Sequence, residues 1–516
     1  MNRSLRLAGS AVVATGLVGL VVASAAPSGQ AATGSPTSTM QGYAADTWRS
    51  MAAMADPTTG LVSDNINGSL APGSRAAYTS PTNIGAYMWS AVAARKTGLI
   101  TTAEEVGRVQ QTLTTLGRLE IHEPSGMFYN WYDPKTGAKL TTWPENGNRL
   151  YPFLSSVDNG WLATALAVVK DQIPSLGAQA DAIRTKMDFG YYYDPAENQI
   201  RGGFWKDPPA ECNVAGNYRA GTTVYYTCHH YGAFNTEPRM ASYLGIAAQQ
   251  IPTKHYFGTW RTFPPIQNGD PCYWGWTEQK PTGVYRTYEG VEVFEGAYHY
   301  RGMSLVPTWG GSMFEALMVP LFVPEEKWGT KSWALTHPTY VAAQIEHGTN
   351  EAGYGYWGFS PSSDPAGGYR EYGVDQIGME PNGYTSDEER TTVDEGYAGC
   401  RPPQPLPTSY GQGIVTPHAS FLALRYAQRA ALANLANLQR NFNAYGPGGF
   451  YDAVNVTTGK VAKRYLSLDQ GMVMAALGNA LGGDVLRHAF SQGSMEQRVA
   501  PLMREEEFSL TPSTTP

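Results

Sequence analysis

The sequence has little charge and few long apolar runs for a chain of 516 residues. Only 16% of its residues are charged, its net charge is −7, and no run of Lys and Arg occurs along it. Because nucleic acids are held by clustered basic residues, this composition argues against a nucleic-acid partner. Beyond residue 26, no stretch is long and apolar enough to cross a bilayer.

Cysteine is scarce as well, with four residues and no CxxC pair. The spacings typical of zinc and redox centres are therefore missing, and we expect neither a metal nor a cofactor. Cys212 and Cys228 bracket a loop rich in Gly, Asn and Pro, so they are the natural pair. Cys272 and Cys400 would then form a second disulfide, although four cysteines allow three pairings and the sequence does not choose among them.

The N-terminus is typical of a secretory signal. Two arginines precede an apolar run over residues 7–26, and small residues follow it. The alternative is an uncleaved membrane anchor, because the run is nearly long enough to span a bilayer. We expect residues 1–32 to be a signal peptide and residues 33–39 a linker. The mature protein would then be secreted, extracellular, free of the membrane and monomeric.

Glycine, proline and aromatic residues are abundant: the chain has 57 Gly and 35 Pro, and 12% of its residues are aromatic. Low charge with this much Gly and Pro suggests a compact core with many elaborate loops. The 32 Tyr and 13 Trp can fill a core, but they also suit a cleft for sugar rings, which have flat apolar faces and polar edges.

Apolar residues recur with helical spacing in twelve segments separated by long loops. These segments are residues 40–55, 81–97, 102–120, 157–171, 174–188, 236–250, 310–323, 333–347, 416–427, 428–442, 468–481 and 484–492. Twelve helices without a strong linker suggest six helical hairpins in a ring, an (α/α)6 barrel, whose long loops would carry function. We expect an all-α domain over residues 40–495, with short strands in loops such as "TTVYYTCHH" and "KVAKRYLSL", and a C-terminal tail over residues 496–516.

Five acidic residues stand out at helix starts and in aromatic loops, namely Asp158, Glu237, Glu315, Asp452 and Asp469. Cutting a glycosidic bond needs two carboxyls, one protonated to assist the leaving oxygen and one ionised as base or nucleophile. Structural roles are open for each of them. Asp158 and Asp469 could be helix N-caps, and Glu237 a first-turn acid. Glu315 could belong to a buried ion pair and Asp452 to a turn.

Several motifs follow one another in an order that resembles a known family. Between about residues 80 and 485 these are "SPTNIGAYMWSAVAARKTGLIT", "GMFYNWYDPKTG", "SSVDNGWLATAL", "FNTEPRMASYLGIAAQQIPTKHYF", "WGGSMFEALMVPLF", "GIVTPHASFLAL", "YGPGGFYDAVN" and "YLSLDQGMVMAAL". In this order they resemble the glycoamylase-like domain of secreted β-1,2-glucanases and of cyclic β-1,2-glucan synthases. The resemblance implies an (α/α)6 barrel with a cleft across its loop face.

The resemblance also implies roles for individual residues. Glu237 would be the proton donor and Asp452 the base of an inverting hydrolase. The supporting or substrate-binding residues would be Asp158, Glu315, Arg239, Trp131, Trp309, Tyr231, Trp357 and Tyr451. A helix N-terminus lowers the pKa of a nearby carboxyl, which is wrong for a proton donor. Glu237 therefore needs burial or a second carboxylate beside it, which Asp158 or Glu315 could supply.

One motif departs from the family pattern. Where the synthase domains carry Trp-Gly-Ile-Ser-Glu, this chain has "WGFSP", so that Pro361 stands in place of a carboxylate. The difference favours plain hydrolysis with inversion over retaining, ring-closing chemistry. We therefore expect a glycoside hydrolase acting on an oligo- or polysaccharide, a β-1,2-type β-glucan. The alternatives are a hydrolase of another extracellular or cell-wall glycan, a non-catalytic carbohydrate-binding protein and a polysaccharide lyase.

Overall fold

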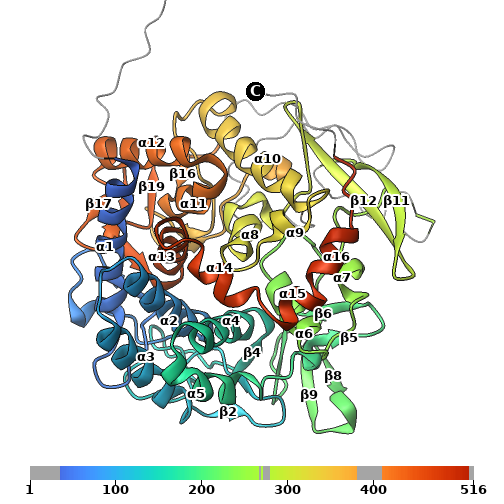
Figure 1. The fold of residues 1–516 in the computed structure, drawn as a ribbon, viewed down its shortest axis with the longest axis horizontal. Helices are drawn as coiled ribbons and strands as arrows, with labels where there is room; N and C mark the ends of the chain where they lie inside the picture. The colour runs from blue at the N-terminus through green and yellow to red at the C-terminus, as the bar shows by residue number, and fades with distance from the viewer. Residues whose placement is uncertain (1–34, 267–268, 271–278, 380–409, 511–516) are drawn as a thin grey trace, which may run out of the picture.

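The helices form a ring with a second layer of helices around it (Figure 1). The computed structural model describes residues 35–266, 269–270, 279–379 and 410–510. The inner layer holds α2 (Pro81–Lys96), α4 (Ser156–Gln172), α6 (Arg239–Ala247), α8 (Met313–Leu317), α11 (Pro417–Leu422) and α13 (Ser467–Leu481). The outer layer holds α1 (Pro36–Met54), α3 (Thr102–Leu116), α5 (Pro174–Arg184), α10 (Trp333–Glu346) and α12 (Leu424–Phe442). Because α13 packs against α2, segments from opposite ends of the chain close the ring.

The two layers differ in how much of each helix is buried. α2, α4 and α13 are buried on nearly every side, as expected for helices that are apolar all round. α3 buries one stripe, which includes Val109, Leu113 and Leu116, and presents its other face to solvent. The inner helices therefore have no polar face to offer except at their ends, where the acidic residues lie.

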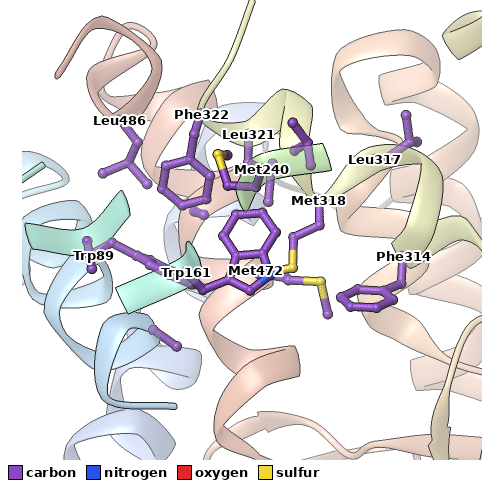
Figure 2. Close-up of a cluster of buried hydrophobic side chains, with 14 of the residues drawn as sticks. Trp89, Trp161, Met240, Phe314, Leu317, Met318, Leu321, Phe322, Met472 and Leu486 are labelled. Atoms are coloured by element: carbon purple, nitrogen blue, oxygen red, sulfur yellow. The ribbon is translucent and has the colours of Figure 1, made fainter. Parts of the chain in front are cut away.

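A cluster of large apolar side chains fills the centre of the ring (Figure 2). Trp89 of α2 and Trp161 of α4 are fully buried and pack edge to face, with ring centroids 6.1 Å apart. α13 approaches α2 closely because it carries Gly471 there. A Cβ at Gly471 would lie only 2.7 Å from the Cβ of Ala86. This close packing fixes the positions of the helix starts relative to one another.

Short antiparallel strands occupy the loops, as predicted. They pair as β1 (Asn65–Asn67) with β21 (Arg464–Leu466); β2 (Ile121–His122) with β3 (Met127–Phe128); β4 (Phe153–Ser155), β7 (Gly203–Trp205), β9 (Thr223–Thr227) and β8 (Asn213–Asn217); β10 (His230–Tyr231), β6 (Gln199–Arg201) and β5 (Tyr193–Asp194); β11 (Thr282–Tyr288), β12 (Val291–Tyr300) and β13 (Met303–Leu305); β14 (Ser362–Ser363) with β15 (Tyr369–Arg370); β16 (Ile414–Val415), β19 (Ala453–Asn455) and β20 (Val461–Ala462); and β17 (Tyr445–Gly446) with β18 (Gly449–Phe450). β11 and β12 form a long hairpin that projects from the ring (Figure 1).

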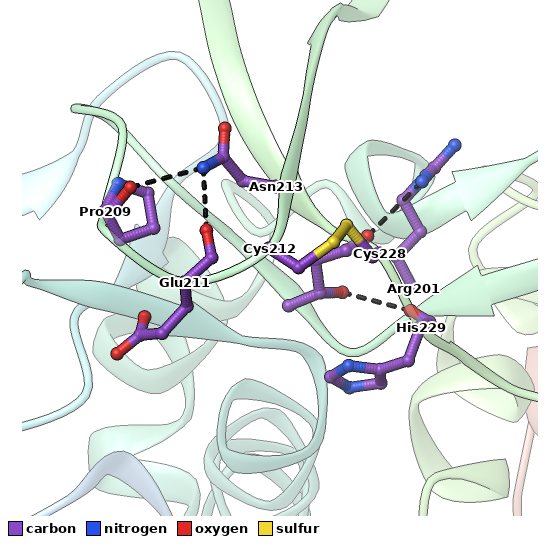
Figure 3. The surroundings of a disulfide bond; sticks show 8 residues. Arg201, Pro209, Glu211, Cys212, Asn213, Cys228 and His229 are labelled. Atoms are coloured by element: carbon purple, nitrogen blue, oxygen red, sulfur yellow. Dashed lines mark hydrogen bonds between the residues drawn. A yellow bond between two sulfur atoms is a disulfide. The ribbon is translucent and has the colours of Figure 1, made fainter.

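The predicted disulfide between Cys212 and Cys228 is confirmed. Their Cα atoms lie 5.7 Å apart, and the bond ties the segment before β8 to the segment after β9 (Figure 3). It closes the strand pair that these two strands form. The second predicted pair, Cys272 with Cys400, lies outside the described residues.

The helix predicted over residues 310–323 is broken into three pieces. Only Met313–Leu317 is α-helical, between 3₁₀ turns at Trp309–Gly311 and Val319–Leu321. Gly310 and Gly311 have φ values of 62° and 66°, which a continuous helix does not allow. A Cβ at Gly311 would lie 1.9 Å from the Val374 carbonyl oxygen, so this turn is also where another backbone segment passes.

The predicted linker and tail are both too long. α1 begins at Pro36, and Ser35 caps it by accepting from the Ser38 N–H, so residues 36–39 are helical rather than linker. At the other end, residues 494–505 form α15 (Ser494–Arg498) and α16 (Ala500–Glu505), and the side chains of Glu506 and Phe508 are buried. The predicted tail from residue 496 is therefore wrong up to residue 510. The predicted signal peptide lies outside the described residues.

Short helices complete the fold, namely α7 (His255–Gly258), α9 (Glu325–Trp328) and α14 (Val485–Phe490). From α13, the chain runs through α14, α15 and α16 toward the β11–β12 hairpin (Figure 1). Within the described ranges, no helix combines the length and apolar character needed to cross a membrane. The fold is a ring of helices whose loops carry many short strands.

Candidate active site

The starts of four inner helices, α2, α4, α6 and α8, are linked by hydrogen bonds. Thr82, in the first turn of α2, donates to Asp158 Oδ1 in the first turn of α4 over 2.8 Å. Trp161 Nε1, one turn further along α4, donates to Glu237 Oε2 over 2.7 Å. The Glu237 backbone N–H in turn donates to Glu315 Oε2 of α8 over 2.7 Å. The acids predicted from their flanking sequences therefore come together at one end of the ring.

Glu237 has the environment that a proton donor needs. Burial raises the pKa of its carboxyl well above the usual value, and the nearby charges of Glu315 and Asp158 raise it further. The Trp161 hydrogen bond and the charge of Arg239 act in the opposite direction. Glu237 precedes α6, which begins at Arg239, so burial and its acidic neighbours outweigh the effect of the helix terminus.

Glu315 is held by polar groups rather than by an ion pair. The Thr236 hydroxyl and the Glu237 N–H both donate to its Oε2. Burial raises the pKa of Glu315, against these two hydrogen bonds and the charge of Arg239. Because each ionised carboxylate disfavours ionisation of the other, burial and this proximity both favour a protonated Glu237. The ion-pair alternative for Glu315 finds no support in the described contacts.

Arg239 fixes the segments that carry these two acids. Its guanidinium is fully enclosed and pairs with Glu325 through bonds of 2.8 and 3.0 Å. The same group donates to the Thr236 and Glu315 carbonyl oxygens over 2.7 and 2.9 Å. Because the Arg239 guanidinium binds both backbone segments, it fixes the spacing between Glu237 and Glu315.

A cavity of about 180 Å³ opens above the two glutamates. Its lining residues are Glu237, Trp309, Gly310, Ser312, Phe314, Glu315, Pro361, Tyr369, Glu371 and Leu468. Trp309 was predicted to contact substrate, and it does line this cavity. Pro361 lines it as well. Glu371, which was not among the predicted site residues, lies ten positions after Pro361 and supplies another carboxyl to this cavity.

A second group of acids lies beside this cavity. Asp452 is only 2% exposed, and its Oδ2 accepts from the Ser363 N–H over 2.6 Å. With Asp469, His418, Tyr451 and other residues it lines a small enclosed cavity. Leu468 lines the Glu237 cavity while its neighbour Asp469 lines the Asp452 cavity, so the two cavities adjoin.

Asp452 and Asp469 behave as a coupled pair. Burial, then the charge of Asp469 and a hydrogen bond to it, raise the pKa of Asp452 well above the usual value. Burial raises the pKa of Asp469 to about 7. Among the described residues, Asp452 Oδ1 and Asp469 Oδ2 have no other hydrogen-bond partner, which is consistent with one shared proton. His418 Nδ1 lies 3.3 Å from Asp469 Oδ2, and burial lowers its pKa to about 4, so this histidine is neutral.

The helix-cap alternatives for two of these acids are wrong. Ser155 caps α4, since its hydroxyl accepts from the Asp158 N–H over 3.1 Å. α13 follows Leu466 with no side-chain cap, and Asp469 lies in its first turn instead. Asp452 is no exposed turn acid either, because its carboxyl is buried. All three carboxyls therefore point into the protein rather than completing a local turn.

The remaining predicted aromatic residues have different surroundings. The pKa of Tyr231 is raised by burial and by the charges of Glu237, Asp158 and Glu315, so its hydroxyl lies among the acids. Tyr451 lines the Asp452 cavity. Trp131 packs edge to face against Tyr78 and Trp143 and has a φ of 117°. Trp357 is 3% exposed and packed in the core, so the structure does not place it in either cavity.

Several residues of the site had no signal in the sequence. Trp161 and Asp64 look like ordinary core and turn residues, yet Trp161 binds Glu237, and the charge of Asp64 raises the pKa of Asp469. Their partners lie 76 positions or more away, so no local pattern could reveal them. Glu371 could have been noticed, because "GGYREYGVD" follows "WGFSP" closely and holds a carboxylate.

Family comparison covers the two halves of the chain separately. Residues 276–492 match the Glycoamylase family, described as "Putative glucoamylase". Residues 42–243 match a family described as a protein of unknown function. Among curated proteins, the chain is similar to the cyclic β-(1,2)-glucan synthase NdvB of Rhizobium meliloti, with 25% identity over 358 residues. That match covers 66% of this chain but only 10% of the synthase.

Solved structures with the same fold come from several organisms. A "putative glucoamylase" from Bacteroides caccae superimposes with a TM-score of 0.60 and 18% identity, covering 91% of this chain and 99% of that one. An endo-β-1,2-glucanase from Chitinophaga pinensis gives 0.63 and 15%, covering 91% and 98%. One from Talaromyces funiculosus gives 0.58 and 12%, covering 93% and 92%. The resemblance inferred from the sequence motifs is confirmed, and the fold is that of these helical barrels.

Proposed function

We propose that this protein is a secreted glycoside hydrolase that cleaves a β-glucan of the β-1,2 type, with Glu237 as the proton donor. The observation that carries the proposal is the position of Glu237. Its carboxyl lines a cavity, and burial together with the charge of the neighbouring Glu315 raises its pKa well above the usual value, as a proton donor requires. Structural relatives include endo-β-1,2-glucanases, which supports the substrate class. We further infer that the helix ring is a six-hairpin (α/α)6 barrel.

Glu237 is oriented to give its proton to a group in the cavity. Trp161 Nε1 donates to Oε2, so the proton of the neutral carboxyl belongs on Oε1. A glycosidic oxygen next to Oε1 would accept this proton as the bond to the anomeric carbon breaks. Trp309 offers a flat apolar surface in the same cavity, which suits the face of a sugar ring.

Asp452 is the candidate base. Burial, the charge of Asp469 and the hydrogen bond to it raise the pKa of Asp452, whereas the same hydrogen bond lowers that of Asp469, so the shared proton favours Asp452, and Asp452 acts as a base once this proton has left. Because Asp452 is almost fully buried, a water or a sugar hydroxyl would have to carry the proton to it. That Glu237 and Asp452 act on one bound sugar chain stays a prediction.

Inversion at the anomeric carbon is part of the proposal. No carboxylate stands at residue 361, and Pro361 instead forms part of the wall near Glu237. A retaining enzyme needs a carboxylate nucleophile against the sugar, whereas inversion needs a water there. Proton NMR of the first product, taken before mutarotation, should show the α-anomer from a β-linked substrate. An initial β-anomer would mean retention and would remove Asp452 from the role of base.

A panel of soluble glycans tests the substrate class. The full-length secreted protein should release new reducing ends from β-1,2-glucan and few from β-1,3-, β-1,4- or α-linked glucans. Activity on another glycan alone would show that the proposed substrate is wrong but that the protein is still a glycoside hydrolase. A product absorbing in the ultraviolet from uronate polymers would indicate a lyase. Binding without turnover would indicate a carbohydrate-binding protein.

A further inference from the structure

The loop over residues 360–371 connects the two acid groups. At its start, Ser360 Oγ lies 2.9 Å from His418 Nε2 and accepts from the Phe314 N–H over 3.1 Å. Three residues later, the Ser363 N–H donates to Asp452. The loop then turns back through β14 and β15 and reaches the Glu237 cavity at Tyr369 and Glu371. One segment therefore contacts Asp452 and also lines the cavity of Glu237.

Successive side chains over residues 369–372 point in opposite directions, as in a β-strand. Arg370 and Tyr372 point back to Asp364, with contacts of 2.9 and 3.1 Å to its Oδ2. Tyr369 and Glu371 have the opposite orientation, as expected for a period of two, and both line the cavity. The Asp364 contacts stabilise the β14–β15 hairpin and so fix the positions of Tyr369 and Glu371 at the cavity.

Neither cavity-facing residue has a structural task of its own. Tyr369 is 52% exposed, which is unusual for a tyrosine in such a tightly packed region. Glu371 makes no hydrogen bond or ion pair in the described contacts. Burial and the charge of Glu315 raise the pKa of Glu371 to about 7, so its carboxyl can both donate and accept near neutral pH. Sugar hydroxyls need partners of that kind.

We propose that Tyr369 and Glu371 form the sugar-binding wall of the Glu237 cavity, with Glu371 hydrogen-bonding hydroxyls of the glucosyl unit whose linkage Glu237 protonates. This inference rests on the proposed function and adds two binding residues to it. Tyr369 packs its ring against the same unit, on the side that faces Asp452. Tyr369 lines the Glu237 cavity and pairs in the hairpin with Ser363, whose N–H donates to Asp452, so it lies near both acid groups.

Binding to a protein that cannot turn over separates this inference from the proposed function. Isothermal titration of a β-1,2-linked glucotriose into the Glu237→Gln variant gives the reference affinity. We expect Glu371→Ala in that background to weaken binding by about 10- to 100-fold, the range for a lost hydrogen bond to a charged group. Glu371→Gln should lose less, Tyr369→Phe little, and Tyr369→Ala about 10-fold or more.

A matched control is Glu197→Gln, an exposed glutamate on the turn between β5 and β6, which should leave the affinity unchanged. Unchanged affinity in both Glu371 variants, with Glu237→Gln still binding, would overturn the inference and leave the proposed function standing. If Glu237→Gln and the wild type neither bind nor cleave the sugar, the proposed function fails and the inference with it.

Steady-state kinetics of the otherwise wild-type protein exclude a different role for Glu371. A binding residue should raise KM in Glu371→Gln while kcat changes by less than about 10-fold. A fall in kcat of Glu371→Gln as large as that of Glu237→Gln, together with a covalent glycosyl adduct on Glu371 in the mass spectrum of the wild-type protein, would make Glu371 a nucleophile. This result would overturn its assignment as a binding residue.

Discussion

Asp469 is the residue that sets the basicity of Asp452. Its charge and its hydrogen bond both raise the pKa of Asp452. Asp469→Asn removes that charge, so Asp452 should ionise at a lower pH. The acidic limb of the kcat/KM profile should therefore move to lower pH, and kcat/KM at the optimum should fall because the base is weaker.

The control for this change is Asp171→Asn, an exposed aspartate near the end of α4, which should leave the profile in place. An acidic limb that does not move in Asp469→Asn would show that Asp452 is not the group that titrates there.

At the residue scale, the sequence predicted the acids better than their surroundings. Glu237 and Glu315 were recognisable because each interrupts an apolar or turn-forming stretch. What raises their pKa values comes from side chains far along the chain, such as Trp161 and Asp158. The structural alternatives for Asp158 and Asp469 failed because Ser155 already caps α4 and α13 has no side-chain cap.

At the scale of elements, the C-terminal segment is anchored by a buried ion pair. Glu506 Oε1 accepts from Arg261 Nε over 2.6 Å, and both side chains are fully buried. Glu506→Gln removes the carboxylate bonded to Arg261 and leaves Glu295, 3.9 Å away, to balance this buried cation, so the free energy of unfolding should fall by about 3–5 kcal/mol. Urea unfolding followed by circular dichroism measures the change.

The neighbouring pair provides the comparison. Glu507 pairs with Arg286 over 3.1 Å, but both side chains are well exposed, so Glu507→Gln should cost less than about 1 kcal/mol. Equal losses in the two variants would show that burial of the Glu506 pair does not matter.

Element boundaries were predictable where a cap or a glycine marks them, and wrong where tertiary contacts decide. α2 begins and α13 ends within a residue of the predicted positions. The helix around Glu315 breaks at Gly311, where the Val374 carbonyl oxygen approaches the backbone closely. This contact is distant in sequence, so no local pattern reveals it. The C-terminal helices α15 and α16 were missed because their burial depends on packing against α6 and α9, which lie far earlier in the chain.

At the scale of the whole molecule, buried carboxyls make stability depend on pH. Burial raises the pKa of Glu295 to about 8, although Arg261 and Arg286 lower it, and the charge of Glu506 raises it further. Since the folded pKa exceeds the unfolded value of about 4.3, the folded state binds more protons between these values. Stability should therefore be highest in weakly acidic solution and fall as the pH rises toward 8.

Glu295→Gln isolates one such contribution. In the part of the chain that the structure describes, neither carboxyl oxygen of Glu295 has a hydrogen-bond partner, so the neutral amide should fit. The variant should match the wild type near pH 4 and become more stable relative to it as the pH rises to about 8, by up to about 1.4 kcal/mol per unit of pKa shift. Melting curves from pH 4 to 9 that stay parallel would contradict this expectation.

The ring of helices was predictable as a whole because its inner helices are apolar on all sides and its motifs follow in order. The sequence could not show that the starts of these helices meet, since this depends on packing such as that of Gly471 against Ala86. Glu237 can face the cavity only because these helix starts lie close together. The proposed activity therefore depends on this packing.

The most direct test of the account is the rate at which the Glu237→Gln variant releases reducing ends from β-1,2-glucan, compared with the wild type. Gln can still accept from Trp161 Nε1 and should keep the fold, as circular dichroism would verify. Because a general acid typically contributes about 10²- to 10⁴-fold, we expect turnover to fall by about 10² or more. Turnover within a few-fold of the wild type, with the fold intact, would contradict the central claim.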